Sequence, residues 1–163
     1  MTRIAIHTED APAAIGPYSQ AVRSGRTVYL SGQIPLDPAT GDLVAGDFHA
    51  QVRRAFDNLA AVCEAAGGSL AHVQRLGLYL VDLGQFGAVN AVMAEYFEAP
   101  YPARSTIGVS PTGASAGAGL AARGINRWRG PRPPRTPRPW AAPRRRWWNA
   151  RDTVPRNSRP SPR

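Results

Sequence analysis

The charge and composition of this chain change abruptly near residue 110, and this change limits which residues can build a folded core. Residues 1–110 carry seven arginines against ten acidic side chains, whereas residues 111–163 carry 13 arginines and a single acid, Asp152. All four tryptophans and ten of the 16 prolines lie in the second part. A segment so rich in Arg and Pro lacks the regularly spaced apolar residues that a folded core requires. The sequence therefore predicts one mildly acidic globular domain, residues 1–115, followed by a basic, disordered tail, residues 116–163.

Several classes of protein are excluded by what the sequence lacks. Its one cysteine, Cys63, rules out an intrachain disulfide framework and a zinc site built from several thiolates. No run approaches the roughly 18 apolar residues of a membrane span, and the N-terminus lacks the apolar stretch of a secretory signal. The three histidines, His7, His49 and His72, are scattered and show no metal-ligand spacing. We expect a soluble cytoplasmic protein with no membrane contact and no bound metal.

The order of apolar patterns predicts a sheet with two helices on one face. Apolar residues recur at helical spacing after Asp47, a good N-cap, and Gly67-Gly68 ends that stretch. Ser24–Arg26 is short enough to join two strands as a hairpin. The expected elements are strands over 4–6, 19–23, 27–31, 73–81 and 104–109, and helices over 48–66 and 82–97. This mixed order predicts an α+β fold, a two-layer sandwich.

The residues after Val109 do not continue this pattern. One more apolar, β-branched strand is needed to complete such a sheet, but Ser110–Leu120 consists mainly of small and flexible residues. We therefore expect the final strand to be doubtful or missing, with an unpaired strand edge where it would lie. A chain with that edge should assemble less stably than one with a complete sheet.

Two side chains of the body stand out on physical grounds. Cys63 lies on the apolar side of the first expected helix, which favours a buried core thiol. Arg104 opens an apolar strand, Ser105–Val109, where a lone guanidinium is costly unless an anion meets it. Arg104 is therefore either an anion-binding residue or a surface arginine that pairs with a carboxylate of the body, and its place in the sequence leaves both interpretations open.

Five short motifs occur in an order and at a spacing that resemble one known family. They are Ile15–Gln20, Ser31–Pro35, Asn58–Leu59, Val89–Asn90 and Pro102–Ser105. From about Ile4 to Ser115 the chain resembles the RidA (YjgF-type) family of reactive-intermediate deaminases. The resemblance implies a chorismate-mutase-like fold, a homotrimer with clefts between its subunits, and no cofactor. It also implies hydrolysis of enamines and imines, such as 2-aminoacrylate and 2-iminobutyrate, to 2-keto acids and ammonia.

The same resemblance assigns roles to individual residues. Arg104 becomes the catalytic clamp, since a planar guanidinium can hold a substrate carboxylate through two parallel hydrogen bonds. The other substrate-binding positions that it implies are Tyr18, Ser31, Gly32, Asn90, Ser105 and Thr106. Thr106 stands where many members have a cysteine. Without the resemblance, Tyr18 is equally compatible with a solvated rim position, and Ser31, Gly32 and Asn90 with turn and capping roles.

One departure from the family bears on catalysis. The family uses a glutamate on its final strand to orient water, but no acid occurs here between Glu98 and Asp152. We therefore expect a deaminase of impaired activity. The alternative from another class is a binding module that holds small keto acids or related carboxylates without turnover.

The basic tail has three possible explanations. Arginines interleaved with tryptophans suit single-stranded nucleic acid, and Pro-Arg repeats suit an extended segment that meets a partner protein. The third explanation, which we favour, is a translated frameshift near Ser115. Shifted by one base, codons for Ala116–Leu120 permit Leu-Glu-Leu-Asp, an alternating acidic strand of the kind that the family carries at this point.

Overall fold

The computed structural model describes residues 2–111 and 118–125, and for the second range only the backbone. The chain divides into two compact units, Met1–Gly130 and Pro131–Arg163. The second unit lies outside the described residues, and so do the suggested contacts of the tail with nucleic acid or protein. The expected disorder of residues 116–163 is wrong for 118–125, which form a strand.

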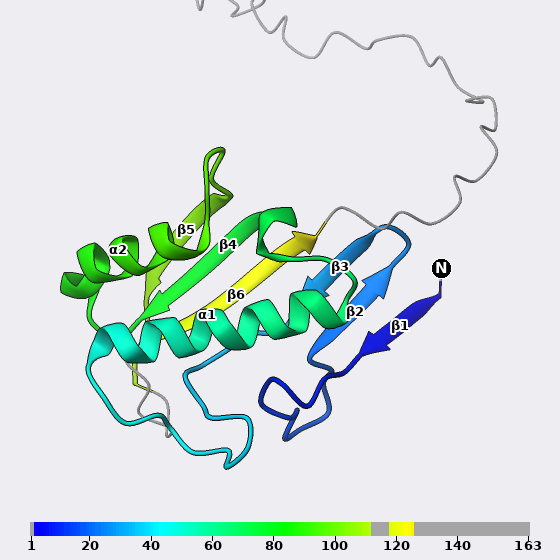
Figure 1. Cartoon of the computed structure of the whole chain (residues 1–163), viewed down its shortest axis with the longest axis horizontal. Helices are drawn as coiled ribbons and strands as arrows, with labels where there is room; N and C mark the ends of the chain where they lie inside the picture. Colours follow the sequence, from blue (N-terminus) through cyan, green and yellow to red (C-terminus); the bar gives the residue numbers. More distant parts are fainter. Residues whose placement is uncertain (1, 112–117, 126–163) are drawn as a thin grey trace, which may run out of the picture. The chain divides into compact units, whose positions relative to one another are not determined.

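The first unit is a two-layer α+β sandwich, as the sequence predicts (Figure 1). One layer is a six-stranded sheet in the order β1-β2-β3-β6-β4-β5, and the other holds two helices that cover one face of that sheet. The strands are β1 (Arg3–Ile6), β2 (Ala21–Ser24), β3 (Thr27–Leu30), β4 (Val73–Leu80), β5 (Ala103–Gly108) and β6 (Ala118–Ile125). The helices are α1 (Phe48–Ala65) and α2 (Phe86–Tyr96), each accompanied by a short 3₁₀ turn, η1 (Leu70–His72) and η2 (Leu83–Gln85).

The sheet is mixed because only β4 and β5 run parallel to each other. Their connection passes through η2 and α2, so this helix and the following strand are placed side by side by one β-α-β crossover. The β1–β3 part is an antiparallel meander, and the β2–β3 hairpin turns at Gly25, whose φ of 60° suits glycine. The expected hairpin is confirmed.

Helix α1 begins and ends where its sequence signals lie. The Asp47 carboxylate accepts a hydrogen bond from the Ala50 amide at 2.8 Å, as an N-cap does. At the other end Gly67, with a φ of 79°, donates its amide to the Glu64 carbonyl, and the Gly68 amide donates to the Cys63 carbonyl. Capping at both ends fixes the length of α1 against the sheet.

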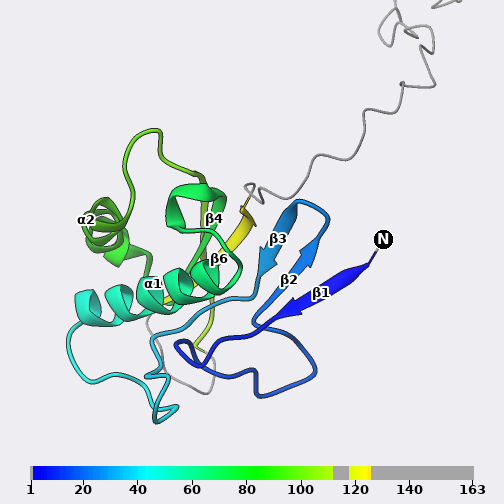
Figure 2. The same ribbon diagram turned by 45° about the vertical axis from the view of Figure 1, so that its right-hand side comes forward.

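The core lies between the helices and the sheet (Figure 2). In β4, buried and exposed residues alternate, so Leu76, Leu78 and Leu80 face the helices. Phe56 of α1 is completely buried and stacks on Tyr96 at a centroid distance of 5.0 Å. The thiol of Cys63 is also buried, which confirms the expected core position. Burial raises the pKa of this thiol to about 12, so it is unreactive at neutral pH.

The expectation that no strand follows Val109 is wrong. Ala118–Ile125 forms β6, which pairs antiparallel with β4 from Val73↔Ile125 to Leu80↔Ala118 and also with β3. The strand is therefore central, and no unpaired edge is left between β3 and β4. Local propensity fails here because strand formation depends on the neighbouring strands, and β6 finds a partner on each side. In the described part of the chain, no helix is long and apolar enough to cross a membrane.

The central position of β6 generates a prediction about truncation. A chain ending at Gly130 should keep one cooperative thermal transition close to that of the full chain. A chain ending at Ser115 should aggregate or lose its transition, because β3 and β4 then present bare edges. Circular dichroism melting and light scattering measure both effects. Equal melting temperatures for the two truncated chains would show that β6 contributes nothing to stability.

Candidate functional site

Arg104 lies on the edge strand β5 and reaches across to helix α2. Its Nη1 donates a hydrogen bond to Oδ1 of Asn90 and contacts Sδ of Met93 at 3.5 Å. Its guanidinium carbon stands 4.8 Å from the centroid of the Phe86 ring. Phe86, Asn90 and Met93 are spaced four and three residues apart, so they share one face of α2. The β4-α2-β5 crossover thus brings three side chains of one helix to one arginine.

The charge of Arg104 has no carboxylate partner among the residues with described side chains. Its hydrogen-bond partner is a neutral amide, and Glu95, a carboxylate of α2, pairs with Arg53 instead. The alternative of an arginine paired with a body carboxylate is therefore not observed. Since a guanidinium carries five N–H donors, several stay available for an incoming anion.

A cavity of about 340 Å³ opens beside this arginine. It is lined by Asn90, Met93, Tyr101, Pro102 and Arg104. The lining combines one cationic and one amide group with a thioether, a proline and an aromatic ring. Such a surface suits a small molecule with a carboxylate at one end and an apolar remainder.

A larger cavity, of about 590 Å³, lies at the C-terminal end of α2. Its lining includes Glu95 and Glu98 but no cationic side chain. Glu95 is already held by Arg53, which lowers the pKa of that carboxyl. The cavity thus offers an anion no partner, and the smaller one at Arg104 is the better candidate site.

The remaining predicted site residues lie elsewhere in the chain. Tyr18 is exposed, and its hydroxyl accepts a hydrogen bond from the Ile15 amide at 3.4 Å. Ser31 follows β3 and donates its hydroxyl to the Ser19 carbonyl at 2.6 Å, while Gly32 beside it is exposed. In the sheet, β6 and β4 separate β3 from the Arg104 strand. Within a single chain, Arg104 therefore contacts Asn90 but does not lie beside Tyr18, Ser31 or Gly32.

Ser105 and Thr106 follow Arg104 in β5 and lie on opposite faces of the strand. Ser105 pairs in register with Gly77, and Thr106 with the buried Leu78, whose face is covered by the helices. The Thr106 hydroxyl is buried and finds no hydrogen-bond partner in the described residues. Neither residue lines the 340 Å³ cavity.

Sequence reasoning missed Phe86, Met93 and Tyr101. The first two could have been found from their spacing to Asn90, because all three fall on one helical face. By itself, the apolar pattern indicates only that Phe86 and Met93 belong to a helix with a buried side. Tyr101 stands in the Pro-Tyr-Pro segment before β5, where no pattern marks it as part of a cavity.

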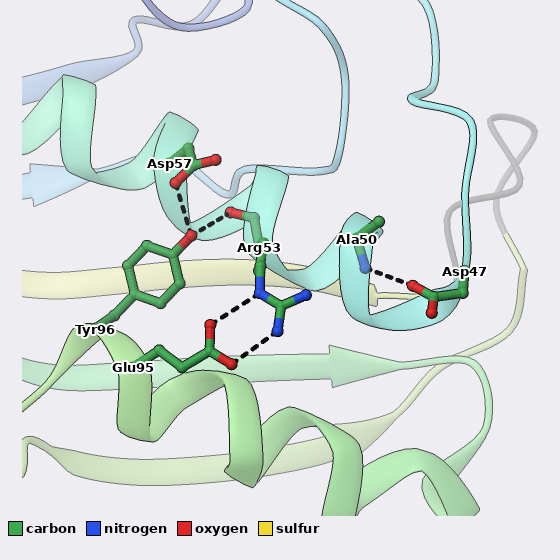
Figure 3. Close-up of polar contacts among 6 residues, drawn as sticks. All are labelled: Asp47, Ala50, Arg53, Asp57, Glu95 and Tyr96. Atoms are coloured by element: carbon green, nitrogen blue, oxygen red, sulfur yellow. Dashed lines mark hydrogen bonds and ion pairs between the residues drawn. The ribbon is translucent and has the colours of Figure 1, made fainter.

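A second polar cluster fixes the position of α2 against α1 (Figure 3). Nε and Nη2 of Arg53 donate to the two carboxylate oxygens of Glu95, each at 2.8 Å. The Tyr96 hydroxyl donates to Asp57 at 2.7 Å. Burial and the Asp57 carboxylate both raise the pKa of Tyr96, so this phenol stays protonated and remains a donor. Because the cluster holds α2 against α1, it helps to fix the position of Asn90 relative to Arg104.

No group of three or more potential metal ligands occurs among the described side chains.

Comparison with known proteins agrees with this fold. The profile of a family described as "Endoribonuclease L-PSP" matches residues 8–115. Protein DfrA of Myxococcus xanthus is 53% identical over 112 residues, 68% of this chain and 86% of the relative. A 2-iminobutanoate/2-iminopropanoate deaminase of Dermatophagoides farinae is 46% identical over 105 residues, 64% of this chain and 82% of the relative. The crystal structure of RidA from an Antarctic Psychrobacter has a TM-score of 0.71 at 41% identity and covers 75% of this chain and 98% of its own.

The unpartnered hydroxyl of Thr106 generates a prediction about stability. Thr106→Val keeps the shape of the side chain and removes a buried polar group, so it should stabilise the protein by about 1 kcal/mol. Thermal melting measures the change. Thr27→Val, at a partly exposed position on β3, is the matched control and should leave the melting temperature nearly unchanged. A lower melting temperature for Thr106→Val would mean that its hydroxyl has a partner after all.

Proposed function

Because this chain belongs to the endoribonuclease L-PSP family, we propose that it acts on small 2-imino acids and their enamine forms. The family match confirms the resemblance to RidA proteins, and several relatives carry the name of 2-iminobutanoate/2-iminopropanoate deaminases. In the proposed reaction, substrates such as 2-aminoacrylate and 2-iminobutyrate are hydrolysed to 2-keto acids and ammonia without a cofactor.

The observation that carries this proposal is the Arg104 guanidinium beside the 340 Å³ cavity. It is held by Asn90 and Met93 at one terminal nitrogen and by the Phe86 ring, and no carboxylate among the described side chains neutralises it. Its remaining N–H groups match the two oxygens of a carboxylate. Arg104 would bind the substrate by its carboxylate, and the imine carbon would then lie near the apolar part of the cavity lining.

The chemical step is the addition of water to the imine carbon. Water contributes its oxygen to that carbon, the C–N bond breaks, and nitrogen leaves as ammonia, so the keto acid keeps all the carbon atoms. The water must be oriented and must lose a proton during the step. No acidic residue occurs between Glu98 and Asp152, so β6 supplies no carboxylate for this purpose. We therefore propose that the protein binds its imino-acid substrate with undiminished affinity but hydrolyses it at a reduced rate.

The absence of that acid also favours a second candidate function. A site with the clamp but without a group that orients water would bind small keto acids and release them unchanged. Calorimetric binding of 2-oxobutyrate without any gain in the hydrolysis rate would identify such a module.

We also propose that the protein assembles as a homotrimer with clefts between its subunits. Tyr18, Ser31 and Gly32 do not line the Arg104 cavity of their own chain, so a second copy would have to supply them. The uncovered face of the sheet provides a surface for assembly. Tyr29, Tyr79 and Ile107 are all exposed, and register pairing places Tyr79 directly beside Ile107.

The role of Arg104 is tested by substitution. Substrate is generated with a threonine dehydratase, and keto-acid formation is followed. Arg104→Ala should lower kcat/KM by roughly tenfold to a hundredfold, because charge-assisted hydrogen bonds contribute about 1.5–3 kcal/mol. Arg26→Ala, an exposed arginine in the β2–β3 turn, is the control and should have no effect. If both variants keep the rate of the unchanged chain, Arg104 is not the clamp.

The proposed assembly is tested by light scattering. The unchanged protein should have three times the mass of its 17.5 kDa chain. Tyr79→Arg should dissociate it, because the substitution puts a charge into the buried part of the interface. Leu83→Arg changes an apolar residue of η2 that is more exposed than Tyr79 and lies away from that face, and it should leave the mass unaltered. A monomeric unchanged protein would refute the proposal.

A further inference from the structure

We propose that Phe86 is a positioning residue for the Arg104 clamp, an inference that rests on the proposed function. Phe86 is the first residue of α2 and is 37% exposed, so it contributes less to the core than Val89 or Met93 of the same helix. Its ring centroid lies 4.8 Å from the guanidinium carbon of Arg104. This distance is typical of a cation–π contact.

The three contacts that Arg104 makes with α2 differ in whether they occupy its N–H donors. Asn90 and Met93 both meet Nη1, so they occupy donors that a carboxylate would otherwise use. The Phe86 ring attracts the positive charge and takes up no N–H group. Phe86 therefore restricts the guanidinium while Nε and Nη2 stay available for a carboxylate.

Restriction of this kind matters because Arg104 lies on an exposed edge strand. Its side chain would otherwise sample many rotamers, and ordering them on binding would weaken the affinity. A guanidinium already held against Phe86 and Asn90 loses less freedom when the ligand arrives. Phe86 would thus strengthen carboxylate binding through Arg104 without a contact of its own to the ligand.

The test compares carboxylate binding in substituted proteins, with 2-oxobutyrate as the probe in calorimetry. Phe86→Leu keeps an apolar side chain but removes the ring, and it should weaken binding by about threefold to thirtyfold. Phe86→Tyr keeps the ring and should restore the affinity of the unchanged protein. Phe48→Leu, the same change at the first residue of α1, is the matched control and should bind normally.

A double-substitution cycle separates positioning from a structural role. In an Arg104→Ala background, Phe86→Leu should cause no further loss of affinity, because the group on which it acts is gone. An equal loss in both backgrounds, or normal binding by Phe86→Leu alone, would overturn the proposal.

If Arg104→Ala itself binds 2-oxobutyrate normally, the proposed function fails instead. The side-chain NMR signal of Arg104 then tests whether Phe86 positions the guanidinium. A ring-current shift of the Arg104 Nε–H that disappears in Phe86→Leu supports the positioning contact, and an unchanged signal refutes it.

Discussion

The hydrogen bonding of β6 on both of its sides joins the two parts of the sheet. On one side lies the β1–β3 meander, and on the other lies the β4-α2-β5 crossover that carries Arg104. Since β3 and β4 have no pairing with each other, the whole sheet depends on a strand whose residues are mainly Gly and Ala. Backbone pairing therefore outweighs local propensity at the centre of this fold.

The same division separates the predicted site residues into two groups. Arg104 and Asn90 belong to the crossover, where α2 and β5 bring them into contact. Tyr18 instead lies between β1 and β2 of the meander, and Ser31 and Gly32 follow β3. Two strands lie between the groups within one sheet, so a single chain does not unite them. The division gives a physical reason for the proposed cleft between subunits, in which the meander of one copy would complete the crossover of another.

The sequence predicts those parts of the fold and site that depend on local signals. Asp47, Gly67 and the helical spacing between them locate α1, and the cost of a lone charge on an apolar strand singles out Arg104. β6 escapes prediction because its formation depends on partners distant in sequence. Phe86 escapes because an aromatic residue on a helix is ordinarily part of the core, and only the crossover places its ring against a guanidinium.

Holding a carboxylate and hydrolysing an imine make different demands on a site. The first needs an oriented cation, and Asn90, Met93 and Phe86 provide the orientation in this chain. The second needs in addition a group that accepts a proton from water while the C–O bond forms. Arg104 cannot accept that proton, since a guanidinium keeps its charge at neutral pH. Under the proposed function, affinity and turnover would therefore depend on separate residues, and a β6 without an acid would reduce turnover while leaving carboxylate binding by Arg104 intact.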